Sequence, residues 1–179
     1  MVHDTYRQYA EAMAKCKDIF QKKLQDYGAS WRIMRPETIT DQIFIKAKRI
    51  RNLQLVGESM VGEGIEPEFM GIVNYGIIGL IQIERGFVDS ADITAEEALA
   101  DYDRHAAEIK QLLFAKNHDY DEAWRQMRIS SFVDIILTKI DRNKEIEDNG
   151  GHTIASEGVG SNYMDMVNYA AFALIKLSE

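Results

Sequence analysis

Two short stretches of the chain have the residue types and spacing of a site that could bind an anion. They read DYGASWRIMR at residues 26–35 and DYDEAWRQMR at residues 119–128. A guanidinium makes bidentate hydrogen bonds to oxyanions, and an indole ring beside it can stack on a planar ligand. The same residues also suit a structural role, because buried aromatic side chains mostly serve packing. Each stretch is therefore either part of a ligand site or a plug over helix ends.

A second group of candidates is a lysine and an arginine three residues apart, at Lys46 and Arg49 and again at Lys139 and Arg142. Residues at this spacing lie on one face of a helix. Each pair can therefore present two cations to a phosphorylated ligand. The alternative interpretation is a solvated, charged helix face.

A third group of candidates lies near the carboxyl end of the chain. Asp165 and Asn168 are three residues apart, Tyr169 follows them, and Glu157 stands upstream in a glycine-rich loop. Carboxylates and side-chain amides supply the hard oxygen ligands that Mg²⁺ prefers. Glu157 and Asp165 are therefore candidate metal ligands. The alternative is an asparagine that bonds a neighbouring helix and an aspartate that favours a helix N-terminus.

These groups recur because the chain contains an internal duplication. Residues 23–50 and 116–143 share 11 identities at a constant offset of 93, and an offset of 94 aligns 73–75 with 167–169. An internal repeat has to be recognised first, because it determines how the domains and the fold of the whole chain are assigned. We expect a first repeat at 1–91 and a second at 92–179. Because Gly71 stands where the second repeat has Asp165, we expect a degenerate site in the first repeat and a more complete one in the second.

Six segments have the apolar periodicity of helices, and no segment has a strand pattern. They cover about residues 5–26, 40–58, 66–86, 94–116, 131–148 and 161–177. Capping boxes are predicted at Thr94–Glu97 and at Ser131–Asp134, and Ser161 is predicted to cap the last helix. A three-helix unit leaves one apolar face that a second unit can cover. The predicted fold is all-α, a tandem repeat of two three-helix units packed as a pseudo-two-fold helical bundle.

Composition limits the partners. The net charge is −8 over 179 residues, which argues against an extended nucleic-acid surface but leaves room for a small phosphorylated ligand. The single cysteine, Cys16, cannot form an internal disulfide and fits a reducing compartment. No apolar run approaches the roughly 20 residues of a membrane span, and the N-terminus lacks signal-peptide features. We expect a cytoplasmic protein with no membrane partner.

The order and spacing of the motifs resemble the nucleotide modification associated domain 1 family. The pattern is YG-x-x-[WF], then K-x-x-R on a helix, then E…D-x-x-N-Y, and the resemblance covers roughly 20–84 and 113–177. The second repeat is the closer match, through Tyr120, Trp124, Lys139, Arg142, Glu157, Asp165, Asn168 and Tyr169. That family in turn looks like a distant relative of the all-α NTP pyrophosphatases of the MazG and dimeric dUTPase type. This chain departs from their EExxE signature, since it has Lys139 and Arg142 in the corresponding helix.

The resemblance implies a nucleotide-binding protein that acts as a Mg²⁺-dependent (deoxy)nucleoside triphosphate pyrophosphatase-like hydrolase in nucleotide-pool or modified-nucleotide metabolism. It implies Mg²⁺ held by Glu157 and Asp165, and a catalytic group of Lys139, Arg142 and Asn168. The implied ligand contacts are Trp124, Arg125, Arg128, Tyr169, Lys46, Arg49 and Asn74. Two alternatives stay open: a non-catalytic nucleotide-binding accessory module, and a helical interaction scaffold. A homo-oligomer is a further expectation, because the related enzymes are dimers or tetramers.

Overall fold

The computed structural model describes residues 4–57, 64–153 and 158–179, and within these ranges the chain forms helices and no strands. Six α-helices follow one another in the described part of the chain: α1 (Thr5–Tyr27), α2 (Pro36–Val56), α3 (Glu66–Arg85), α4 (Ala95–Tyr120), α5 (Ile129–Asp148) and α6 (Val159–Ser178). Two one-turn 3₁₀ helices, η1 (Ser30–Ile33) and η2 (Ala123–Gln126), hold the same place in the two repeats. None of the helices in the described ranges is both long and apolar enough to cross a membrane.

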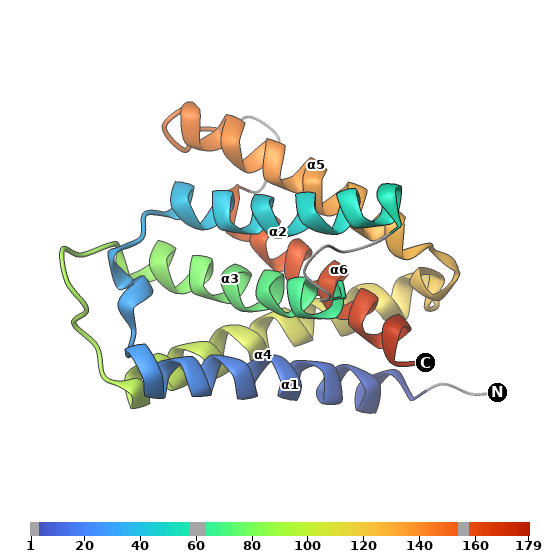
Figure 1. Cartoon of the computed structure of the whole chain (residues 1–179), viewed down its shortest axis with the longest axis horizontal. Helices are drawn as coiled ribbons and strands as arrows, with labels where there is room; N and C mark the ends of the chain where they lie inside the picture. The colour runs from blue at the N-terminus through green and yellow to red at the C-terminus, as the bar shows by residue number, and fades with distance from the viewer. Residues whose placement is uncertain (1–3, 58–63, 154–157) are drawn as a thin grey trace.

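The helices form three layers of two, and each repeat contributes one helix to each layer (Figure 1). The outer layers are α2 with α5 and α1 with α4, and the middle layer is α3 with α6. One continuous cluster of buried apolar residues includes side chains from all six helices. The predicted all-α, pseudo-two-fold bundle of two three-helix units is therefore confirmed, and the repeats share one core.

The middle layer is tight because small residues stand where α3 crosses α6. A Cβ added at Gly76 would lie 2.5 Å from Cγ2 of Val167, and one added at Gly79 would lie 2.8 Å from Cε2 of Tyr163. The positions of α6 that align with these two glycines are Ala170 and Ala173, and both are fully buried. Interiors are close-packed, so larger residues here would push the two repeats apart.

Of the three N-terminal helix caps predicted from the sequence, the structure contains one. Thr94 forms the predicted capping box, because its Oγ1 accepts a hydrogen bond from the Glu97 N–H at 3.1 Å. The predicted caps Ser131 and Ser161 are wrong, since α5 already begins at Ile129 and α6 at Val159. In α5 the chain enters the helix directly from η2, so tertiary packing of that turn outweighs the local capping pattern. α2 likewise begins at Pro36, whose missing N–H costs nothing in a first turn.

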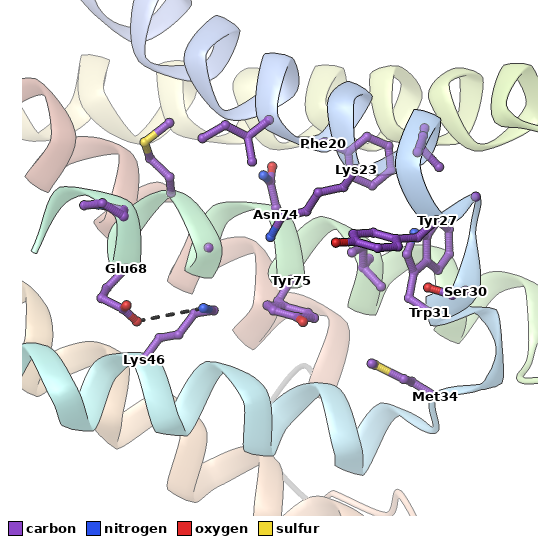
Figure 2. A pocket seen from close by; sticks show the side chains of 17 residues that line it. Phe20, Lys23, Tyr27, Ser30, Trp31, Met34, Lys46, Glu68, Asn74 and Tyr75 are labelled. Atoms are coloured by element: carbon purple, nitrogen blue, oxygen red, sulfur yellow. Dashed lines mark ion pairs between the residues drawn. The ribbon is translucent and has the colours of Figure 1, made fainter. Parts of the chain in front are cut away.

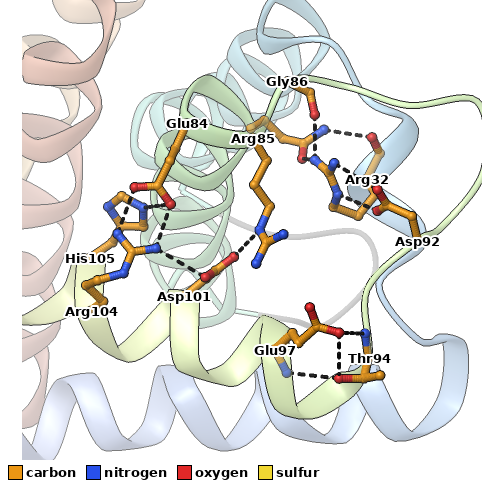
Figure 3. Close-up of polar contacts among 11 residues, drawn as sticks. Arg32, Glu84, Arg85, Gly86, Asp92, Thr94, Glu97, Asp101, Arg104 and His105 are labelled. Carbon is orange, nitrogen blue, oxygen red and sulfur yellow. Dashed lines mark hydrogen bonds and ion pairs between the residues drawn. The ribbon is translucent and has the colours of Figure 1, made fainter.

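A polar network fastens the end of α3 to α4 and so joins the two repeats (Figure 3). Asp101 accepts hydrogen bonds from Arg85 and from Arg104, the latter at 3.1 Å. Arg104 also pairs with Glu84 of α3. Burial alone would raise the pKa of Asp101, but the two guanidinium hydrogen bonds outweigh burial and hold it below its usual value. The carboxylate therefore favours the packed arrangement of α3 and α4.

Candidate functional site

Each repeat forms a pocket, and the two pockets are lined by aligned residues. The first pocket has a volume of about 500 Å³ and lies between α1, η1, α2 and α3. The second pocket has a volume of about 260 Å³ and lies between α4, η2 and α6. Six pairs of aligned, identical residues line both: Lys23/Lys116, Tyr27/Tyr120, Trp31/Trp124, Met34/Met127, Asn74/Asn168 and Tyr75/Tyr169. The duplication therefore extends from the helices to the cavity that each repeat encloses.

Trp124 lines the second pocket with its edge, because both faces of its ring are covered. Phe172 stacks on one face, with ring centroids 4.2 Å apart and an angle of 6° between the planes. The Arg125 guanidinium carbon lies 4.4 Å from the ring centroid. The indole Nε1 donates to Asn117 at 3.1 Å. A base could stack on the face of Trp124 only by displacing Phe172 or Arg125.

The arginines that follow the tryptophans lie away from both pockets and anchor the 3₁₀ turns. Arg32 is 2% exposed, pairs with Asp92 at 2.9 Å and donates to the Gly86 carbonyl oxygen at 2.7 Å. Arg125, an expected ligand contact, instead donates to Gln8 at 2.6 Å and to Glu179 at 3.0 Å. The two guanidiniums therefore have a structural role, which was the alternative interpretation of the tryptophan–arginine motif.

The turns are also held from α3 and α6 by side chains at aligned positions. Gln82 Nε2 donates to the carbonyl oxygens of Arg32 at 2.9 Å and Met34 at 2.7 Å. Lys176 Nζ donates to the matching carbonyls of Arg125, at 3.0 Å, and Met127. The motif thus forms the same turn in both repeats, although the residue that holds it differs.

In the second pocket two lysines pair with one carboxylate. Asp165 on α6 is bound by Lys116 of α4 at 3.2 Å and by Lys139 of α5 at 3.0 Å. Its side chain is 15% exposed. Lys139 thus reaches Asp165, although it is not among the residues that line the pocket. Arg142 is exposed on α5, and Arg128 is exposed just before that helix, and neither lines a pocket.

In the first pocket the acid stands one helical turn earlier. Gly71 replaces Asp165, and the stem of Lys46 fills the space, so that an added Cβ would lie 2.6 Å from Lys46 Cε. The Lys46 ammonium faces Glu68 at 3.8 Å (Figure 2), and Arg49 pairs with the same carboxylate at 3.3 Å. Lys46 and Arg49 therefore come together, as their spacing predicted.

The two asparagines are held by tyrosines of the opposite repeat. Asn74 donates to the Cys16 carbonyl oxygen at 3.0 Å and accepts from the Tyr102 hydroxyl at 2.8 Å. Asn168 accepts from the Tyr9 hydroxyl at 3.5 Å. Tyr9 and Tyr102 themselves align at the offset of 93. The asparagines at the pocket walls thus also bond neighbouring helices, which was the structural alternative for these positions.

The described donors do not fit a magnesium site. Asp165 is the one carboxylate among the residues that line the second pocket, and it is already bound by two ammonium groups. Residues 4–57, 64–153 and 158–179 contain no cluster of three or more potential metal ligands. The other predicted ligand, Glu157, lies outside the described residues. Mg²⁺ asks for several oxygen ligands that are free to turn towards it.

Two features of these pockets, the aligned lysines and Glu68, were not among the predicted site residues. Lys23 and Lys116 stand four residues before Tyr27 and Tyr120, so each pair shares a helix face. Their identity in both repeats was the signal that could have found them. Glu68 had no such signal, because the second repeat has Asn162 at the aligned position. The tyrosines deeper in the pockets, Tyr75 and Tyr169, have pKa values raised chiefly by burial, so they stay neutral donors at pH 7.

Comparison with protein families gives one match. A family model described as nucleotide modification associated domain 1 matches residues 23–83 and 116–177. The two matched segments contain most residues of the two pockets, and they fall one in each repeat. Neither the comparison with curated proteins nor that with solved structures found a match.

Proposed function

Because the chain belongs to the nucleotide modification associated domain 1 family, we propose that it binds a phosphorylated nucleotide in the pockets of its repeats. The observation that carries the proposal is the joint occurrence of aromatic walls and lysine side chains in aligned cavities. An ammonium or guanidinium makes charge-assisted hydrogen bonds to phosphate oxygens. Aromatic and thioether side chains supply apolar contacts for a base, and small-molecule sites commonly combine these features.

The charge distribution supports the same proposal. The chain as a whole carries a net charge of −8, yet Lys23 and Lys46 line the first pocket, where Glu68 is the one carboxylate among the lining residues. Arg49, beside the pocket, pairs with Glu68 as Lys46 does. A local excess of cations in an acidic protein favours a small anion over a long polyanion, which would be repelled by the remaining surface.

A magnesium-dependent pyrophosphatase-like activity is the second candidate. It is favoured by the position of the Asp165 carboxylate beside Asn168 and Tyr169 at the second pocket. It depends on Glu157 as the second ligand and on release of Asp165 from its two lysines. Since the described donors do not fit the ion, binding is the function that the geometry supports better.

A calorimetric and thermal-shift panel tests both candidates. The mono-, di- and triphosphates of each common nucleoside are added in EDTA and, separately, in Mg²⁺. A nucleotide at 100 times its dissociation constant should stabilise the fold by about 2.7 kcal/mol, and the parent nucleoside should do so far less. A complete lack of binding by every nucleotide would disprove the proposal. Pyrophosphate release that needs Mg²⁺ and is lost in Asp165→Asn would establish the second candidate.

A further inference from the structure

We infer that the first pocket is the phosphate-binding site, used without a divalent cation, and that Asp165 prevents phosphate binding at the second pocket by pairing with Lys116 and Lys139. The inference rests on the proposed function and names the pocket and the ligand chemistry that it uses. It reverses the expectation that the second repeat has the more complete site.

Asp165 blocks anion binding at the second pocket because it connects three helices through its ion pairs. Lys116 on α4 and Lys139 on α5 reach the same carboxylate of α6, one to each oxygen. The bridge gives both ammonium groups a carboxylate partner, and an incoming phosphate would have to compete with that carboxylate. The remaining cavity of about 260 Å³ is smaller than the roughly 300–1,000 Å³ of typical ligand sites.

The first pocket lacks this bridge because Gly71 has no side chain. Among the described residues no carboxylate pairs with Lys23, the equivalent of Lys116. Lys46, the equivalent of Lys139, turns to Glu68 with a long separation of 3.8 Å and is 25% exposed. Both ammonium groups therefore remain able to bind an anion. The cavity of about 500 Å³ falls within the range of typical ligand sites.

The layout of the first pocket also orients the ligand (Figure 2). Lys46 and Glu68 stand at one end, Tyr27 and Trp31 at the other, and Tyr75 lies between them. Tyr27 is 72% exposed, so its ring is free to cover a base at the pocket mouth. The phosphates would therefore lie at the lysine end and the base at the aromatic end. Glu68 competes with the phosphates for Lys46 and so favours ligands with more than one phosphate.

The chain contains two tryptophans, and one lines each pocket. Their indole N–H signals in a ¹H–¹⁵N NMR spectrum therefore report each pocket separately, after assignment with Trp31→Phe and Trp124→Phe. The probes are the four common deoxynucleoside triphosphates, each added alone in EDTA, and inorganic tripolyphosphate as the base-free anion. The expected result is a saturable shift of the Trp31 signal, little change at Trp124, and one bound molecule per chain by calorimetry.

Matched variants test which lysine side chains contribute to nucleotide binding. Lys46→Met keeps the packed stem but removes the ammonium, and it should weaken binding at least tenfold, whereas Lys139→Met should not. Lys23→Ala should weaken binding, and Lys22→Ala serves as its control, because Lys22 pairs with Asp18 on the exposed side of α1. Asp165→Gly should release Lys116 and Lys139, add a shift at Trp124 and raise the stoichiometry from one to two.

The outcomes separate this inference from the proposed function. Binding that shifts Trp124 first, that needs Mg²⁺, or that is lost in Lys139→Met but kept in Lys46→Met would overturn the inference and leave nucleotide binding intact. Two equal sites in the unaltered chain would do the same. No binding by any of these probes in EDTA would overturn the inference, and no binding by any nucleotide of the wider panel, in EDTA or in Mg²⁺, would overturn the proposed function as well.

Discussion

The two pockets have aligned walls but differ in how their lysines are paired. At the second pocket Lys116 and Lys139 are bound by Asp165, whereas in the first pocket Lys23 faces the cavity and Lys46 faces a more distant Glu68. The difference originates at two aligned positions, Gly71 against Asp165 and Glu68 against Asn162. A duplicated scaffold thus preserves where the lysines stand, while the position of the carboxylate decides whether they bind the protein or remain available to a ligand.

The turns that precede the pockets show the converse. Arg32 and Arg125 anchor the same 3₁₀ turn, but Arg32 binds Gly86 and Asp92 between α3 and α4, whereas Arg125 binds Gln8 of α1 and Glu179 after α6. The same geometry is therefore retained with different partners, which indicates that it is the turn, rather than its arginine contacts, that both repeats require.

The largest expected effect is on stability and separates these two arginines. Arg32→Ala should cost about 3 kcal/mol, because it removes a fully buried side chain and leaves the buried Gln82 amide oxygen without its donor. Arg125→Ala should cost less, about 1 kcal/mol, since its carboxylate partner Glu179 is 40% exposed. Urea unfolding of both variants measures the difference. Equal costs would show that the burial of Arg32 does not matter.

The second prediction converts the first pocket into the second. Gly71→Asp places a carboxylate against the Lys46 stem, where the new Cβ would lie 2.6 Å from Cε and Lys46 must move. The carboxylate should then bind Lys46 and Lys23, and nucleotide affinity should fall at least tenfold, about 1.4 kcal/mol. Calorimetry in EDTA measures the loss. Unchanged affinity, with circular dichroism showing an intact fold, would mean that the acid at this position does not control the pocket.

A third pair of variants compares the cross-repeat hydrogen bonds. Tyr102→Phe leaves the buried Asn74 oxygen without its 2.8 Å donor and should cost about 1–2 kcal/mol. Tyr9→Phe removes a bond of 3.5 Å and should cost less than about 0.5 kcal/mol. Thermal and urea unfolding give both values. A larger cost for Tyr9→Phe would contradict the different strengths that these two distances imply.

The smallest expected effect concerns pH and a carboxylate that only the second repeat has. Burial, with nearby acids, raises the pKa of Glu147, although Thr40 donates to it at 2.8 Å. Above its folded pKa the charged form is less stable in the fold than in the unfolded chain. Glu147→Gln, which introduces the residue of the aligned Gln54, should therefore raise Tm by about 1–2 °C at pH 7.

The gain from Glu147→Gln should vanish as the pH falls below the ordinary carboxyl range near 4.3, where the native residue is protonated in both states. Asp101→Asn is the contrast, because the pKa of Asp101 is lowered and its charged form stabilises the fold at pH 7. That variant should lower Tm at pH 7, with the loss shrinking in acid. Calorimetric scans from pH 3 to 7 test both signs, and a constant effect of Glu147→Gln across this range would contradict its assignment to ionisation.

Much of the fold could be predicted because its determinants are local or repeated. Apolar periodicity located six helices, and the bare face of a three-helix unit implied the pairing of the repeats. The predicted N-terminal caps at Ser131 and Ser161 were wrong because α5 and α6 each begin two residues earlier, at Ile129 and Val159. Tertiary packing around η2 and α6 determines these helix starts. Local capping contributes about 1 kcal/mol, which tertiary packing can exceed.

The sequence by itself determined the duplication, the all-helical class and some of the residues that line the pockets, such as Trp124, Asn168 and Tyr169, since these depend on identity and spacing along the chain. Only the tertiary structure decided what the residues do there. Asp165 meets Lys116, 49 positions away, and this contact makes it a partner of cations and leaves it poorly placed to hold a metal. Arg125, which was expected to contact the ligand, instead donates hydrogen bonds to Gln8 and Glu179. The role of a charged side chain depends on its nearest neighbours in space, and in a helical bundle many of those neighbours come from other helices.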